Sequence, residues 1–138
     1  MSLTCEDKQS ISELLCRAAY AYDERELDML EACFSESATF TIQIVDADLI
    51  GPFEGREAVM TLYRDSLDAQ TDVRRHVISN IFFESEGDTP TVYSNLTLFA
   101  TENGECRLLC TGVYRDTLQR VGDAWLLYRR HLDLDSAY

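Results

Sequence analysis

The second half of the chain has the pattern of consecutive β-strands joined by very short turns. Thr71–Phe83 is rich in Val, Ile and Phe, and similar segments follow at Thr91–Thr101, Glu105–Thr117 and Ala124–Leu134. Their connections, EGDTP, ENGE and QRVGD, are rich in turn residues. Connections this short can join only neighbouring antiparallel strands. This half of the chain therefore predicts a four-stranded antiparallel meander.

The first half of the chain has helical periodicity instead. An amphipathic helix is predicted from Glu6 to Tyr22, and Thr4 or Asp7 is placed to cap its start. A strand at Ala38–Val45, a loop with room for a short strand and a second long helix at Arg56–Ala69 follow. The inward-facing apolar residues are expected to be Ile11, Leu14, Leu15, Ala18, Ala19 and Tyr22 in the first helix, Leu27, Leu30, Cys33 and Phe34 in a short helical pattern after it, and Val59, Met60, Tyr63 and Leu67 in the second long helix. Helices gathered before a meander predict an α+β fold in which a curved sheet wraps over a long helix.

Length and composition indicate one domain over residues 1–138. Hydrophobic residues make up 46% of the chain, which is enough for a single core. The net charge of −13 repels nucleic acid and anionic lipid, and no apolar run reaches the roughly 20 residues that span a membrane. Five cysteines, no C-x-x-C pair and no charged-then-apolar leader predict a reduced, cytoplasmic protein without disulfides. Neither histidine has metal-ligand spacing, so no metal site is predicted.

The predicted strands carry apolar residues on both faces. In Thr71–Phe83, simple alternation places Val73, Val77, Ile81 and Phe83 on one side and His76, Ile78, Asn80 and Phe82 on the other. The helices can cover only the concave face of the sheet. We therefore expect the convex face to pack against a second copy of the chain in a homo-oligomer, most simply a dimer.

His76 is the side chain best suited to move a proton near neutral pH. It lies in the middle of an apolar strand, and Asp23 follows a buried-looking Tyr22 at the expected end of the first helix. Two interpretations stay open at this point: His76 transfers protons together with a partner side chain, or it is a core histidine satisfied by a carboxylate or a backbone carbonyl. The second histidine, His131, is expected to be exposed or to lie in an interface.

The order of elements resembles the NTF2-like superfamily and, within it, the SnoaL-like group. The resemblance covers nearly the whole chain and is carried by four segments: AYAYDERELDML (19–30), FEGREAVMTLY (53–63), RRHVISNI (74–81) and GVYRDTLQRVGDAWLLYRRHLDLD (112–135). It implies a cystatin-like cone, in which a bent, mixed or antiparallel sheet surrounds a pocket that the first helix closes on one side. The superfamily hosts many activities, so the resemblance speaks for the fold more than for the function.

Within that superfamily, Tyr22-Asp23 followed by His76 resembles the scytalone dehydratase type and related isomerases. That resemblance implies a cofactor-independent lyase or isomerase for a small, largely apolar, oxygenated or cyclic substrate. Asp23 would orient the imidazole and His76 would transfer the proton. Tyr22, Asn80 and Asn95 would be hydrogen-bond donors in the pocket. Scytalone dehydratase has a second histidine on the following strand, where this chain offers only Asn95.

Arg130 fits the same family pattern and is expected to point inward. It would either contact an anion in the pocket or form a salt bridge with Asp135, and the salt bridge is the favoured interpretation.

A second branch offers a different function. RHVISN, the Ser94-Asn95 pair and the spacing of Trp125, Arg130 and Leu134-Asp135 resemble the small β subunit of aromatic-ring-hydroxylating dioxygenases. Such a subunit is a non-catalytic, trimeric partner of the subunit that holds the metal centres, and this chain has no Cys/His set for those centres. A third interpretation is a ligand-binding protein without turnover.

Overall fold

The computed structural model describes residues 2–138. Its elements are α1 (Cys5–Asp23), α2 (Leu27–Ala32), β1 (Phe34–Ile44), β2 (Ile50–Glu54), α3 (Arg56–Ala69), β3 (Val73–Ser85), β4 (Thr91–Glu102), β5 (Glu105–Val121) and β6 (Ala124–Leu134). The predicted α+β order of helices before a meander is confirmed. β1 begins four residues earlier than expected, and β5 continues past Thr117.

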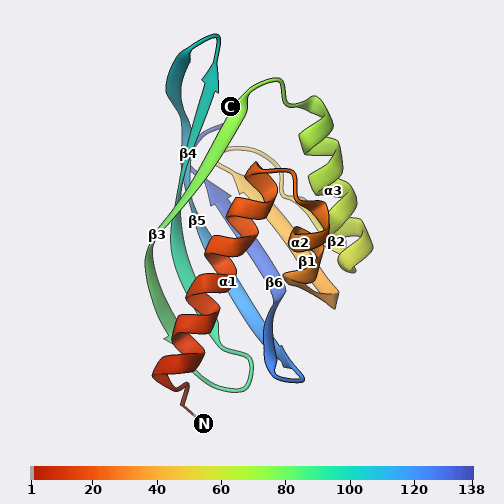
Figure 1. Ribbon diagram of the computed structural model, residues 1–138, viewed down its shortest axis with the longest axis vertical. Helices are drawn as coiled ribbons and strands as arrows, with labels where there is room; N and C mark the ends of the chain where they lie inside the picture. The colour runs from red at the N-terminus through yellow and green to blue at the C-terminus, as the bar shows by residue number, and fades with distance from the viewer. Residues whose placement is uncertain (1) are drawn as a thin grey trace.

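The strands form one sheet in the order β2-β1-β6-β5-β4-β3. Every neighbouring pair is antiparallel except β1 and β6, which are parallel, so the sheet is mixed. Figure 1 shows α1 lying across one face of this sheet, with α3 beside it. α1 packs against β3 and β6, and α3 packs against β1 and β2. The two helices thus cover the concave face, and β3 is left as an edge strand.

The core lies between these helices and the concave face. α1 buries Ile11, Leu14, Leu15, Ala18 and Ala21, and α3 buries Val59, Met60, Tyr63 and Leu67. The inner face of α3 is the one predicted from its periodicity. In α1 the buried alanines are Ala18, as predicted, and Ala21, whereas the predicted Ala19 is only partly buried.

The early start of β1 corrects the expected helical pattern at Cys33 and Phe34. Helix α2 ends at Ala32, and Phe34 pairs with Leu127 of β6. The Leu127 amide donates to the Cys33 carbonyl at 2.8 Å. Both Cys33 and Phe34 are buried as predicted. An apolar pair is buried equally well by a helix or a strand, and here pairing with β6 decides for the strand.

A β-bulge in β3 overturns the simple alternation expected along that strand. Ser79 pairs with Asn95 and Phe82 with Tyr93, so two residues of β3 stand opposite one residue of β4. Asn80 occupies the bulge with φ +53°, a left-handed conformation that asparagine tolerates better than most residues. Beyond the bulge Phe83 packs against the core, and the exposed Phe82 stacks on Tyr93 at 5.1 Å between ring centroids.

Carboxylates hold both ends of α1. At its start Thr4 and Asp7 form a capping box, with both hydrogen bonds at 3.0 Å. Asp7 also accepts hydrogen bonds from Arg120 at 2.6 Å and from the indole of Trp125 at 3.2 Å. The backbone amide of Thr4, followed by Arg120 and Trp125, lowers the pKa of Asp7. At the other end, the last residue of α1 is Asp23, whose position is therefore set by a helix anchored on the β5–β6 hairpin.

The convex face of the sheet exposes several apolar side chains. Val73, Val77 and Phe82 of β3 are 54%, 44% and 57% exposed. The homo-oligomer expected from sequence stays a prediction. No helix among residues 2–138 is both long enough and apolar enough to cross a bilayer.

At Gly112 the backbone of β6 leaves no room for a side chain on β5. A Cβ atom at this position would lie 2.5 Å from the backbone carbonyl oxygen of Asp133. We predict that Gly112→Ala lowers the free energy of unfolding by about 1–3 kcal/mol, because neighbouring backbone must shift to admit the methyl group. Gly87→Ala is the matched control, since nothing lies within 4 Å of its added Cβ. Urea unfolding of both variants would measure this, and equal stabilities would contradict the close approach.

Candidate active site

An interior cavity of about 80 Å³ lies between α1, α3 and the concave face of the sheet. Its lining is largely aliphatic and aromatic: Tyr22, Phe40, Ile42, Leu62, Tyr63, Ser66, His76, Leu96, Tyr114, Leu132, Leu134 and Tyr138. His76 is the one basic side chain in this lining, which contains no Asp or Glu. A wider depression of about 590 Å³ lies between the start of α1 and the β5–β6 hairpin, but it is open to solvent and is far from His76 in the fold.

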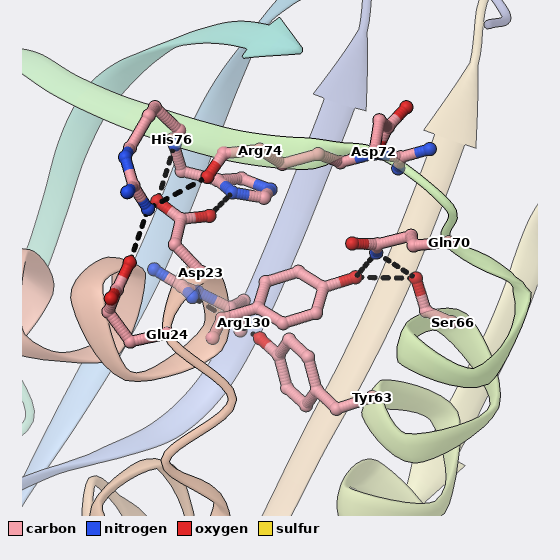
Figure 2. A network of polar contacts seen from close by, with 11 residues as sticks. Asp23, Glu24, Tyr63, Ser66, Gln70, Asp72, Arg74, His76 and Arg130 are labelled. Carbon is pink, nitrogen blue, oxygen red and sulfur yellow. Dashed lines mark hydrogen bonds and ion pairs between the residues drawn. The ribbon is translucent and has the colours of Figure 1, made fainter. Parts of the chain in front are cut away.

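Asp23 and His76 are in direct contact. One carboxylate oxygen of Asp23 lies 2.5 Å from Nδ1 of His76, and the other accepts the backbone N–H of His76 at 2.7 Å (Figure 2). Only 6% of the Asp23 side chain and 7% of the His76 side chain are exposed. The pair that the sequence suggested across more than fifty positions is thus brought together at the cavity wall.

The geometry of this pair decides which nitrogen of His76 is engaged by Asp23 and which one is free. A carboxylate beside Nδ1 favours the tautomer with the proton on Nδ1. In that tautomer Nε2 carries the lone pair. Figure 2 shows that the far side of the imidazole ring points away from Asp23. A lone pair held at the wall of an apolar cavity can accept a proton from a bound molecule. Whether it does so in this chain stays a prediction.

Tyr22 joins His76 to a polar cluster on α3. Its ring lies 4.8 Å from the His76 ring between centroids, and its hydroxyl lies 2.5 Å from Oγ of Ser66. The side-chain amide of Gln70 donates to both of these oxygens, at 3.3 and 3.2 Å. Burial raises the pKa of Tyr22, so the phenol is neutral. The cluster therefore presents neutral hydroxyl groups at the cavity.

Arg130 points inward as expected, but its partner is Asp116 and neither Asp135 nor an anion in the cavity. Its Nε and Nη2 donate to the two carboxylate oxygens of Asp116, at 2.9 and 3.2 Å. Asp135 instead accepts from the hydroxyl of Thr111 at 2.7 Å. Although burial itself opposes the charge, Asp116 and the neighbouring tyrosines hold the pKa of Arg130 well above its usual value. Arg130 is thus the inner half of a buried ion pair and does not line the cavity.

Asn80 and Asn95 lie elsewhere, which corrects their expected place as donors in the pocket. Both are exposed, and neither is among the residues that line the cavity. Asn80 occupies the bulge, and Asn95 alternates with the inward-facing Ser94 and Leu96 and so lies on the convex face. His131 also lies on the convex face, between Thr41 at 2.6 Å and Asp133 at 2.9 Å.

Sequence reasoning missed Ser66, Gln70, Tyr114 and Asp116. A signal existed for the last two, because Tyr114 and Asp116 alternate with exposed residues and share a face with the buried Leu118. Ser66 and Gln70 carried no such signal, since their role depends on how α3 meets Tyr22. Within residues 2–138, no group of three or more His, Cys, Asp or Glu side chains is arranged to hold a metal ion.

The fold and the cavity define a class of protein. In it a curved sheet and its helices form a cone, and the cavity inside is lined by a histidine and several tyrosines. The model of the SnoaL-like domain family matches residues 4–131, and the chain belongs to that family. An uncharacterized protein of Mycobacterium tuberculosis is 26% identical over 127 residues, which cover 90% of this chain and 82% of that protein.

Solved structures share the NTF2-like, cystatin-like fold. A protein of unknown function with a cystatin-like fold from Nostoc punctiforme superposes with a TM-score of 0.80 at 23% identity, covering 98% of this chain and 96% of that chain. The β subunit of a putative aromatic-ring-hydroxylating dioxygenase from Novosphingobium aromaticivorans superposes with a TM-score of 0.81 at 19% identity, covering 94% and 90%. At these identities the likeness establishes the fold alone.

The buried ion pair gives a prediction about stability. Arg130→Met leaves the Asp116 carboxylate buried without its partner, so we expect the free energy of unfolding to fall by about 3–5 kcal/mol. The double variant Arg130→Met/Asp116→Leu removes both charges and should recover most of that loss. Chemical denaturation of the two variants measures the difference. A double variant no more stable than the single one would contradict this account of the pair.

Proposed function

We propose that this protein is a cofactor-independent acid/base lyase or isomerase that acts on a small, largely apolar, oxygenated or cyclic substrate. The observation that carries the proposal is the 2.5 Å contact between Asp23 and Nδ1 of His76 at the wall of an apolar cavity. Membership of the SnoaL-like family is compatible with isomerase or cyclase chemistry and with ligand binding.

In the proposed reaction His76 is the only group that changes its protonation state. Its Nε2 takes a proton from a carbon next to a carbonyl group, and Asp23 stabilises the imidazolium that forms. The same proton then goes to another carbon, which is isomerisation, or to a departing hydroxyl group, which is elimination. An apolar surrounding strengthens the Asp23–His76 interaction because little water screens it.

Burial of the pair favours a purpose beyond packing. Removing a carboxylate and an imidazole from water costs free energy that apolar residues of similar size would not cost. Asp23 does have a structural role through the backbone N–H of His76. That role requires only the carboxylate, however, and any residue except proline at position 76 would supply the N–H. The imidazole itself is left for the proposed chemistry.

The small cavity limits the substrate in the conformation described. Pockets for drug-sized ligands typically enclose about 300–1,000 Å³, whereas this cavity has about 80 Å³. We therefore propose a substrate of few heavy atoms, unless side chains at the rim such as the exposed Tyr138 move aside.

The second candidate is a non-catalytic subunit of the dioxygenase β type. It is supported by the similarity to the β subunit from Novosphingobium aromaticivorans and by the apolar side chains that β3 exposes on the convex face. This function requires a larger partner and leaves the cavity and His76 without a reaction.

Proton transfer by His76 can be tested before the natural substrate is known. We predict that the protein accelerates deuterium incorporation next to the carbonyl of small cyclic ketones such as cyclopentanone in D₂O, followed by NMR. His76→Gln should lower this rate by about 10²–10⁴-fold, while its side-chain amide can still donate to Asp23. His131→Gln, which alters the convex face, is the control and should exchange at the wild-type rate.

Asp23→Asn should also slow the exchange, because asparagine has one acceptor oxygen where aspartate has two, and its NH₂ group cannot accept the second hydrogen bond from His76. Its unfolding must be measured in parallel, since the backbone contact is weakened too. Indistinguishable exchange rates in wild type and His76→Gln would rule out the proposed chemistry and favour a binding or subunit role.

A further inference from the structure

The buried pair Arg130–Asp116 has no part in the chemistry proposed for His76. The exposed fractions of the two side chains are 4% and 0%. A buried ion pair is often no more stabilising than apolar residues of similar volume. Besides Asp116, Arg130 contacts Tyr63 and Tyr114, and both of these residues line the cavity.

Arg130 extends beyond Asp116 to the hydroxyl group of Tyr63. Its Nη1 donates to the Tyr63 oxygen, with 3.4 Å between the two atoms. Because Tyr63 accepts at its oxygen, its O–H proton must be donated elsewhere. No hydrogen bond from this O–H group to another described residue is present, and Tyr63 lines the cavity. A molecule inside the cavity could accept this proton.

Tyr63 lies in the same row of rings as His76. The Tyr22 ring contacts both of them, with 4.7 Å to the Tyr63 centroid and 4.8 Å to the His76 centroid. In Figure 2, Tyr63 and Arg130 lie below His76 and Asp23 in the view. A small molecule in the cavity can therefore meet a base and a hydrogen-bond donor together.

The surroundings of Tyr63 suit a donor that keeps its proton. Burial raises its pKa to about 12, although Arg130 opposes that increase. The phenol therefore stays neutral in ordinary buffers. The hydrogen bond from Arg130 polarises the hydroxyl and makes its proton a better donor. A neutral donor of this kind places no full charge in an apolar cavity.

We propose that Tyr63, positioned by Arg130 and Asp116, donates a hydrogen bond to the substrate oxygen on which negative charge develops. This inference rests on the proposed function and names its substrate class: a carbonyl compound with a removable proton on the adjacent carbon and, on the carbon beyond it, either a C=C bond or a hydroxyl group. As Nε2 of His76 takes that proton, the C–H electron pair forms a C=C bond and the carbonyl π pair moves onto oxygen. Tyr63 stabilises this enolate oxygen. The electrons return when the imidazolium protonates a second carbon or a departing hydroxyl, which leaves as water.

Arg130 is a positioning residue in this account, because it acts through Tyr63 and does not line the cavity. Arg130 also contacts Tyr114. Its guanidinium lies 4.0 Å from the Tyr114 ring centroid, and Tyr114 lines the cavity. A cation over the ring withdraws electron density from the phenol. Tyr114 is thus the second donor that the same ion pair can support.

The infrared band of a bound carbonyl tests the hydrogen bond without requiring turnover. With ¹³C=O cyclopentanone as the probe, the wild-type protein should show a bound carbonyl band at lower frequency than the ketone in hexane. Tyr63→Phe should move that band toward the hexane value and slow deuterium exchange by about 10²–10³-fold, the usual effect of losing one donor to a developing oxyanion. Tyr20→Phe, which removes an exposed hydroxyl on α1, is the matched control and should change neither quantity.

Two further variants separate this inference from the proposed function. His76→Gln should slow exchange by about 10²–10⁴-fold and leave the band in place. The double variant Arg130→Met/Asp116→Leu should move the band part of the way toward hexane while the protein stays folded. If Tyr63→Phe moves the carbonyl band but the wild-type protein does not accelerate deuterium exchange, the chemistry of His76 is refuted and the hydrogen bond from Tyr63 to the carbonyl oxygen is supported. A band that Tyr63→Phe leaves unchanged, a band that the double variant leaves unchanged, or no bound ketone at all would overturn the proposal.

Discussion

Asp23 joins the fold to the candidate site through one carboxylate. β3 is an edge strand, and edge strands leave backbone N–H groups without partners in the sheet. One oxygen of Asp23 satisfies such a group at His76, and the other oxygen holds the imidazole of the same residue. The end of α1, the edge of the sheet and the orientation of the ring are therefore fixed together. A change in the length of α1 would alter all three, because Asp7 anchors the other end of α1 to the β5–β6 hairpin.

The interior separates charge from the space that a ligand would occupy. Charges lie behind the wall: Asp23 behind His76, and Asp116 with Arg130 behind Tyr63. Phenols, one hydroxyl group and the imidazole of His76 line the cavity. Asp23 can thus act on the cavity only through His76, and the Arg130–Asp116 pair only through Tyr63 and Tyr114. This arrangement suits a reaction in which charge appears only transiently, because a permanent charge in the cavity would bind water and anions instead.

The elements and their order were predictable from periodicity, and the contact between Asp23 and His76 was anticipated through the family resemblance. What escaped prediction depends on bulges. Counting back from the β5–β6 turn, Leu118 pairs with Leu127, and uninterrupted pairing would place Arg115 opposite Arg130. A register shift after Leu118 instead brings Asp116 opposite Arg130 and creates the ion pair. The bulge at Asn80 likewise moves Phe82 outward. Such shifts arise from the fit of two strands to each other, which the periodicity of either strand alone does not contain.

The central claim is that Asp23 holds His76 with its proton on Nδ1 and leaves Nε2 free toward the cavity. Long-range ¹H–¹⁵N NMR of the two histidine rings in alkaline buffer tests this directly, because the two neutral tautomers give distinct ¹⁵N shifts. The account predicts the Nδ1–H tautomer for His76. It predicts the Nε2–H tautomer for His131, whose Nε2 faces the Asp133 carboxylate at 2.9 Å, so that the second ring is an internal reference. Finding His76 as the Nε2–H tautomer, with no lone pair on that nitrogen, would contradict the account.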